Sequence, residues 1–199
     1  YGAQGIRVAL DGQEIFDLDA SEVGVPLQPG RFGFYNHSQS DVRYANFRSS
    51  GRFEDDLTVD QFAYDDFTGV DELQTYGNAS VVDGELELTP SDTGQVGVVW
   101  HRSKPRVADG FATEFTFRIT EPIPYITQDA SADGFAFVIH NNGQGLQAQG
   151  SAGAGVGYGG LANSVAIEFD TYQNGYDPDG NHIHVDFRDV VFKNRRHVN

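Results

Sequence analysis

The stretch VAIEFDTYQNGYDPDGNHIHVDF, residues 165–187, contains two β-like runs separated by an acidic turn. Apolar and polar residues alternate in both runs, as they do in strands with one buried face. Residues 168–184 include four carboxylates, two asparagines and two histidines. So much negative charge repels itself unless a proton or a cation lies among the carboxylates. The stretch therefore predicts two strands with a cation site at the turn between them.

Short strand-like runs recur along the rest of the chain, separated by Gly, Asp, Asn and Pro. Asp11–Gly12 and Asp83–Gly84 each lie between two such runs, and this dipeptide suits tight hairpin turns. We find no convincing window of apolar residues at helical spacing, so we predict an all-β sandwich of antiparallel sheets. The other predicted strands are RFGFYN (31–36), VRYANF (42–47), QVGVVWH (95–101), TEFTFRI (113–119) and GFAFVIH (134–140).

The composition limits the kinds of partner. The chain of 199 residues has 13 basic and 29 acidic residues, a formal net charge of −16. Nucleic acids and anionic membranes bind cationic surfaces, so we expect neither a nucleic-acid partner nor membrane insertion. The sequence has no Cys, which rules out disulfides and thiolate metal sites. This composition fits a cation-binding or extracellular protein.

The alternation after position 167 suggests which atoms a cation would meet. On an extended strand Glu168, Asp170, Tyr172 and Asn174 project on one face, and Asp177 follows in the turn. Oxygen donors from Asp, Asn and a backbone carbonyl suit Ca²⁺. Carboxylates joined by an imidazole suit a transition ion such as Mn²⁺.

Two Asp–His pairs compete for the transition-metal position. In Asp177 with His182 and in Asp179 with His184 the spacing between Asp and His is the same, and the second pair lies two residues further along the chain. We favour Asp177 with His182, and both pairs stay open at this point.

Five segments in order resemble the legume-type (L-type) lectins, which share the concanavalin-like jelly roll. The run EFDTYQN…DP…NHI is similar to the metal-binding segment of that family, and the resemblance covers about residues 63–187. The other four segments are DDFTGVDELQTYGNASVVDGELELTP (65–90), VGVVWHRSKPRVADGFATEFTFRIT (96–120), SADGFAFVIHN (131–141) and GAGVGYGGLANSVAIEFD (153–170).

The resemblance implies two cation sites, one for Ca²⁺ and one for Mn²⁺ or another divalent transition metal. The transition-metal ion would be held by Glu168, Asp170, Asp177 and His182. The Ca²⁺ ion would be held by Asp170, the backbone carbonyl of Tyr172, Asn174 and Asp177.

The resemblance also implies a sugar site beside the cations. Asp133, preceded by a cis peptide bond from Ala132, would accept hydrogen bonds from sugar hydroxyls. The Asn174 side chain would contact both Ca²⁺ and sugar, and the backbone N–H of Gly153 would complete the polar set. The ring of Tyr172 would stack on a pyranose. The implied function is cation-dependent, non-catalytic binding of glycans or polysaccharide.

Two other functions compete with this one. Some glycoside hydrolases of the same fold use Glu-x-Asp-x-x-Glu, but residues 168–173 end in Gln173, and an amide cannot act as acid or base. We therefore expect no enzyme. The second alternative is a structural or adhesive sandwich that Ca²⁺ stiffens without binding sugar.

The first part of the chain resembles a different module. Residues 1–48 are similar to the closing strands of a thrombospondin C-terminal or laminin-G-like sandwich, and the polar residues 49–62 suggest a linker. Residues 63–199 would be the N-terminal two-thirds of a legume-type lectin domain, incomplete as given. Either the chain is a segment of a larger multidomain protein, which we favour, or the first strands complete the lectin sandwich in permuted order. We expect an extracellular adhesion or polysaccharide-capture protein, secreted or at the cell surface of a bacterium.

Overall fold

The computed structural model describes residues 5–19, 30–37, 39, 41–51, 62–92, 94–104, 111–120, 132–188 and 196–198. These residues form antiparallel β-strands and two single 3₁₀ turns, η2 (Gly145–Gln147) and η3 (Gly153–Gly155). The fold is all-β, as the sequence predicts. In the described part of the chain, no helix is both long and apolar enough to cross a membrane.

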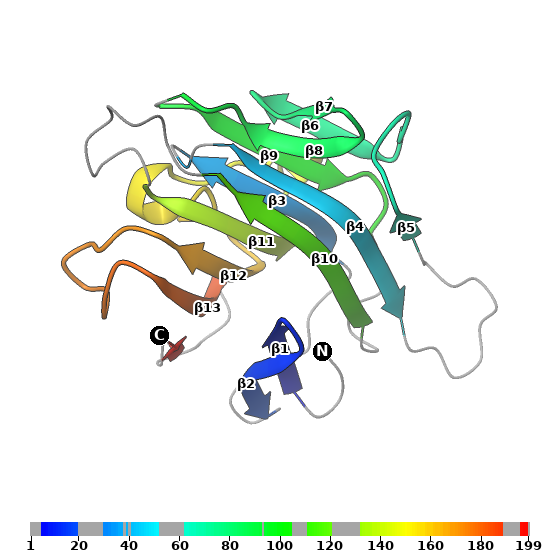
Figure 1. The fold of residues 1–199 in the computed structure, drawn as a ribbon. Helices are drawn as coiled ribbons and strands as arrows, with labels where there is room; N and C mark the ends of the chain where they lie inside the picture. Colours follow the sequence, from blue (N-terminus) through cyan, green and yellow to red (C-terminus); the bar gives the residue numbers. More distant parts are fainter. Residues whose placement is uncertain are drawn as a thin grey trace.

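The strands form two facing sheets and a separate hairpin (Figure 1). The seven-stranded sheet has the order β14 (Arg196–Val198), β13 (His182–Arg188), β12 (Ser164–Asp170), β11 (Gly134–His140), β3 (Arg31–His37), β9 (Val96–His101) and β6 (Leu73–Gly77). The five-stranded sheet has the order β10 (Phe111–Ile119), β4 (Val42–Gly51), β8 (Glu85–Thr89) and β7 (Ser80–Val82), with β5 (Phe62–Tyr64) paired to β4. The hairpin consists of β1 (Gly5–Leu10) and β2 (Gln13–Asp19).

Both predicted hairpin turns are present. Asp11 and Gly12 have φ angles of 51° and 76°, and Asp83 and Gly84 have 52° and 82°. Two consecutive residues at positive φ match the twist of the flanking strands, and Asp-Gly adopts this conformation at low cost. The predicted strands are likewise all found, as β1 to β4 and β7 to β13.

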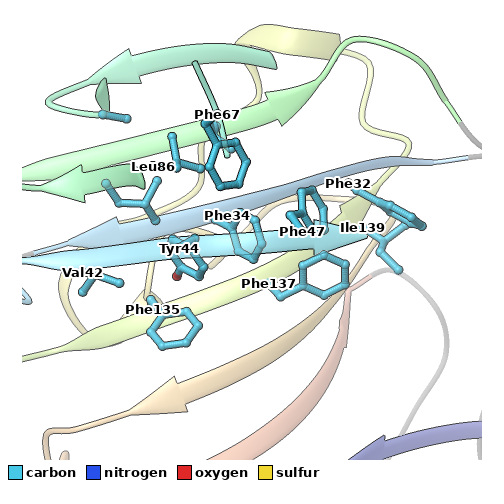
Figure 2. Close-up of a cluster of buried hydrophobic side chains, with 13 residues drawn as sticks. Phe32, Phe34, Val42, Tyr44, Phe47, Phe67, Leu86, Phe135, Phe137 and Ile139 are labelled. Carbon is cyan, nitrogen blue, oxygen red and sulfur yellow. The ribbon is translucent and has the colours of Figure 1, made fainter. Parts of the chain in front are cut away.

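Aromatic side chains fill the space between the two sheets (Figure 2). Phe34 of β3 stacks on Tyr44 of β4 with ring centroids 4.1 Å apart, and Phe137 of β11 lies 5.5 Å from Phe34. All three side chains are 1% exposed or less. Burying such rings supplies much of the driving force that holds the two sheets together.

The glycine-rich loop, residues 141–163 between β11 and β12, covers the outer face of the larger sheet. Val156, Tyr158 and Leu161 of this loop form a second apolar cluster with residues of β3, β9, β11 and β12. The indole N–H of Trp100 donates a hydrogen bond of 2.9 Å to the carbonyl of Ala148 in the same loop. β11 is consequently buried along its whole length, because both of its faces are covered.

Strands from the first part of the chain lie inside the sandwich. β3 pairs with β11 and β9, and β4 pairs with β10 and β8. β3 and β4 therefore share their sheets with strands from the part of the chain after residue 61. The middle of the predicted linker, residues 52–61, lies outside the described residues. How the chain divides into domains stays a prediction.

Candidate functional site

Four neighbouring strands align their ends in one row across the larger sheet. Backbone pairing places Gly134 of β11 opposite both His37 of β3 and Asp170 of β12, and Asp170 opposite His182 of β13. Alternate residues share a face, so Glu168 and Asp170 lie on the outer face with Ala166, which packs under the glycine-rich loop. The row gathers polar groups from distant parts of the sequence at one edge of that loop.

Asp170, Asp177 and His182 form a compact group of potential metal ligands. One ligand atom from each lies within 4.8 Å of the other two. The Nε2 atom of His182 is 3.9 Å from Asp170 Oδ2 and 3.9 Å from Asp177 Oδ1. The three side chains are nearly buried, with 1%, 4% and 4% of the His182, Asp170 and Asp177 side chains exposed. Two carboxylates and one imidazole are a donor set that a divalent cation can occupy.

The turn after β12 places these groups through its own backbone. Asp170 Oδ1 accepts a hydrogen bond of 2.7 Å from the N–H of Tyr172, and Asp177 Oδ2 accepts one of 2.7 Å from the N–H of Asn174. The strand ends at Asp170, so the extended conformation under which Tyr172 and Asn174 would share its face does not continue to these residues. These two residues lie instead in the turn, which folds Asp177 back toward Asp170.

Burial makes the charged form of Asp170 unfavourable. Burial, together with the negative charges of Glu168, Asp177 and Asp133, raises the pKa of this carboxyl to about 7, against the hydrogen bond from the N–H of Tyr172, which lowers it. A divalent cation between the carboxylates would remove this repulsion. The residues present thus fit a cation both in donor chemistry and in electrostatics.

The two candidate Asp–His pairs have different surroundings. Asp177 lies beside the Nε2 atom of His182, whereas Asp179 lies 3.9 Å from the Nδ1 atom of the same ring. The Asp179 side chain is 42% exposed and accepts a hydrogen bond of 2.9 Å from the N–H of Asn181. The structure therefore groups Asp177 with His182, and it does not pair Asp179 with His184 among the ligand groups of the described residues.

Glu168 lies next to this group but has its own partners. Its Oε2 atom accepts a hydrogen bond of 2.6 Å from the hydroxyl of Tyr158 and lies 3.2 Å from Nδ1 of His184. All three side chains are buried. We did not predict a role for Tyr158, because nothing in the sequence connects a tyrosine of the glycine-rich loop with Glu168.

Asp133 is fixed by the strands on both sides of it. The peptide bond between Ala132 and Asp133 is cis, as the resemblance implies. The N–H of Asp133 donates to the carbonyl of His37 at 3.1 Å, and its carbonyl accepts from the N–H of Thr171 at 2.9 Å. Thr171 directly follows Asp170, so the backbone at Asp133 is connected to the group of metal ligands.

Gly153 and Asp133, from separate loops, meet at the side chain of His37. The N–H of Gly153 donates to Nδ1 of His37 at 3.1 Å, and Asp133 Oδ2 lies 3.3 Å from the same nitrogen. A Cβ atom added to Gly153 would be 4.0 Å from Asp133 Oδ2. Sequence reasoning missed His37, since it simply ends a strand and belongs to no recognisable spacing.

Comparison with known protein families identifies the family of the chain. The Legume lectin domain model matches residues 59–199. The chain belongs to the legume lectin family. This lectin-family chain is 35% identical over 144 residues to the bark lectin of Styphnolobium japonicum, an alignment of 60% of this chain and 49% of that protein. It is 34% identical over 143 residues to a lectin-related protein of Cladrastis kentukea, covering 60% of this chain and 46% of that one.

The alignments cover part of each relative. The lectin-family chain spans about half the length of the curated relatives it matches. A third relative, the seed lectin of Styphnolobium japonicum, is 31% identical over 138 residues. No solved structure matches the chain significantly.

Proposed function

We propose that this chain binds carbohydrate without catalysis, and that Ca²⁺ together with Mn²⁺ or another divalent transition metal supports the binding site. The observation that carries the proposal is the convergence of the Asp133 carboxylate and the Gly153 N–H on one point beside the Asp170, Asp177 and His182 group. A carboxylate acceptor and a backbone donor directed at one point suit a sugar hydroxyl, which both donates and accepts. The relatives named lectins support the same function.

The cations act on the protein and do no chemistry on the sugar. Asp170, Asp177 and His182 would hold the transition-metal ion, with Glu168 beside them, while the Tyr172 carbonyl and Asn174 would complete the Ca²⁺ set. Neutralising Asp170 and Asp177 fixes the turn after β12, and the hydrogen bond from Thr171 carries this order to Asp133. A site that is already ordered loses less conformational freedom when the sugar binds.

A hydrolase of this fold is disfavoured by the residue at position 173. The third position of the acidic hydrolase motif is Gln173, an exposed side chain whose amide donates to the carbonyl of Pro178 at 3.4 Å. An amide cannot pass a proton between leaving group and water, as the two-carboxylate mechanism requires. We further propose that the protein acts outside the cell, in adhesion or polysaccharide capture.

A glycan array with Ca²⁺ and Mn²⁺ present tests the proposal, with EDTA and the variant Asp133→Ala as comparisons. Both EDTA and Asp133→Ala should abolish glycan binding, because one removes the cations and the other the hydroxyl acceptor. Thermal unfolding separates them: EDTA should lower the Tm, while Asp133→Ala should keep the rise in Tm that the cations produce.

Three results would contradict the proposal. Undiminished glycan binding in EDTA would remove the role of the cations. Release of reducing ends from polysaccharide would reveal a hydrolase. A protein that the cations stabilise but that binds no glycan would be the structural sandwich.

A further inference from the structure

The Nδ1 atom of His37 has two contacts that it cannot satisfy together. Gly153 donates its N–H to this nitrogen at 3.1 Å, and Asp133 Oδ2, an acceptor, lies 3.3 Å from it. A ring nitrogen of histidine either accepts or donates. If Nδ1 accepts the hydrogen bond from Gly153, its lone pair also lies close to the negatively charged carboxylate of Asp133. If Nδ1 instead carries a proton and donates it to Asp133, that proton lies close to the N–H of Gly153. One contact is therefore unfavourable in either tautomer.

A hydroxyl group at the same point has no such conflict. It carries one donor hydrogen and two acceptor lone pairs, so one oxygen can accept from Gly153 and donate to Asp133 at the same time. The nitrogen of His37 thus occupies the position that suits a hydroxyl oxygen better than it suits an imidazole.

We propose that His37 closes the sugar site in the free protein and that a hydroxyl of the bound carbohydrate displaces its ring. The inference rests on the proposed function and adds an internal competitor to it. It also restricts the ligand: the displacing group has to be a free hydroxyl. An ether oxygen at that position could accept from Gly153 but could not donate to Asp133.

The local structure lets the ring move while its backbone stays in place. His37 is the last residue of β3, and its carbonyl accepts hydrogen bonds from the N–H groups of Asp133 and Gln39. Its side chain is 21% exposed and that of Asp133 is 13% exposed, so both reach solvent. Rotation about the Cα–Cβ bond of His37 takes the ring off Asp133 and Gly153 without disturbing the pairing of β3 with β11.

Closure by His37 lowers the apparent affinity for sugar, because only the fraction of molecules whose His37 ring has left the site can bind it. Removing a competing hydrogen bond of ordinary net strength should tighten binding roughly fivefold. The variant His37→Ala should therefore bind a simple sugar more tightly than the unmodified chain.

The contact itself is tested without sugar, by amide hydrogen exchange of Gly153 in ¹⁵N-labelled protein with Ca²⁺ present. Exchange at Gly153 should be slow in the unmodified chain and faster in His37→Ala. His37→Phe keeps a ring of similar volume without nitrogens, so it should also exchange faster even if His37→Ala folds poorly. Glu114→Ala, on the exposed face of β10, is the matched control and should leave the exchange unchanged.

The displacement is tested by calorimetric titration with galactose, N-acetylgalactosamine, mannose and glucose. Tighter binding by His37→Ala than by the unmodified chain and Glu114→Ala supports the proposal, as does binding by His37→Ala alone. Equal or weaker binding by His37→Ala overturns it, and so does unchanged exchange at Gly153. Absence of binding in every variant, the unmodified chain included, overturns the proposed function as well. Binding by the unmodified chain that His37→Ala does not tighten overturns this inference alone.

Discussion

His140 is a buried histidine whose charge the protein cannot accommodate. The residue is 1% exposed at the end of β11, with its ring 4.3 Å from that of Trp100 and its Nδ1 accepting from the N–H of Asn142 at 3.1 Å. Burial, together with the smaller effect of the positive charges of Arg31 and Lys104, lowers the pKa of His140 to about 4. The folded protein therefore holds His140 neutral under conditions where the unfolded chain would protonate it.

This difference predicts a loss of stability in acid. The unfolded histidine takes up a proton near pH 6.5 and the folded one near pH 4. Between these values the unfolded chain binds more protons, so the contribution of His140 is complete above pH 6.5 and falls by about 3 kcal/mol as the pH reaches 4. Urea unfolding at pH 7 and pH 4.5 should show a smaller decrease for His140→Asn, whose amide oxygen can replace Nδ1. Equal decreases in both proteins would show that His140 does not titrate in this way.

Individual residues of the candidate site were predictable to different degrees. Asp170, Asp177 and His182 stand close in the sequence around one turn, so their spacing indicated that they would meet. His37 and Tyr158 reach the site through strand pairing and through the glycine-rich loop. Such contacts depend on which strands become neighbours, and no local pattern of residues records that.

At the level of elements, alternation and Asp-Gly turns predicted the strands, because both signals are local. The path of the turn after β12 depends on side-chain to backbone hydrogen bonds, which are also local but which alternation does not record. Side-chain oxygens of Asp170 and Asp177 accept backbone N–H groups of Tyr172 and Asn174, so the chain leaves the sheet although its polar alternation continues. Asp side chains commonly compete in this way with strand pairing.

The contact between β8 and β9 joins the two sheets and predicts a severe effect of one added methyl group. A Cβ atom on Gly97 of β9 would lie 1.8 Å from the carbonyl oxygen of Leu88 on β8. Backbone atoms cannot move aside like the end of a side chain, so Gly97→Ala should force the two strands apart and cost about 2–4 kcal/mol. Urea unfolding measures this cost.

A second glycine supplies the matched control. Gly143 has nothing within 4 Å of an added Cβ, so Gly143→Ala should leave the free energy of unfolding within about 0.5 kcal/mol of its original value. If Gly97→Ala unfolded at the same urea concentration as Gly143→Ala, the prediction drawn from the close approach of β8 and β9 would be wrong.

For the molecule as a whole, the sequence predicted the sandwich and its family but not which strands lie together. The order of the larger sheet places β3 between β11 and β9, neither of which is adjacent to it in the sequence. The hairpin of β1 and β2 packs Ile6, Phe16 and Leu18 against Val165 and Val185 of β12 and β13. Apolar alternation shows that a strand has a buried face, and it does not show which partner covers that face.

Two variants decide which aspartate links the proposed cation binding to the stability of the folded chain. Asp177 lies in the buried ligand group, whereas Asp179 is two residues away and 42% exposed. Each accepts one backbone N–H, from Asn174 or Asn181, so both substitutions to Ala remove a comparable hydrogen bond. The informative quantity is therefore the change in Tm on adding cations, measured for each variant against its own metal-free form.

A ligand that binds the folded state at a hundredfold excess over its Kd stabilises it by about 2.7 kcal/mol. For a chain of this length that corresponds to a rise in Tm of about 5–10 °C. Calorimetry with Ca²⁺ and Mn²⁺ should show this rise for the unmodified chain and for Asp179→Ala, and should show almost none for Asp177→Ala. The reverse pattern would assign the site to Asp179 and His184, because only a residue that binds the cation in the folded state can link its concentration to stability.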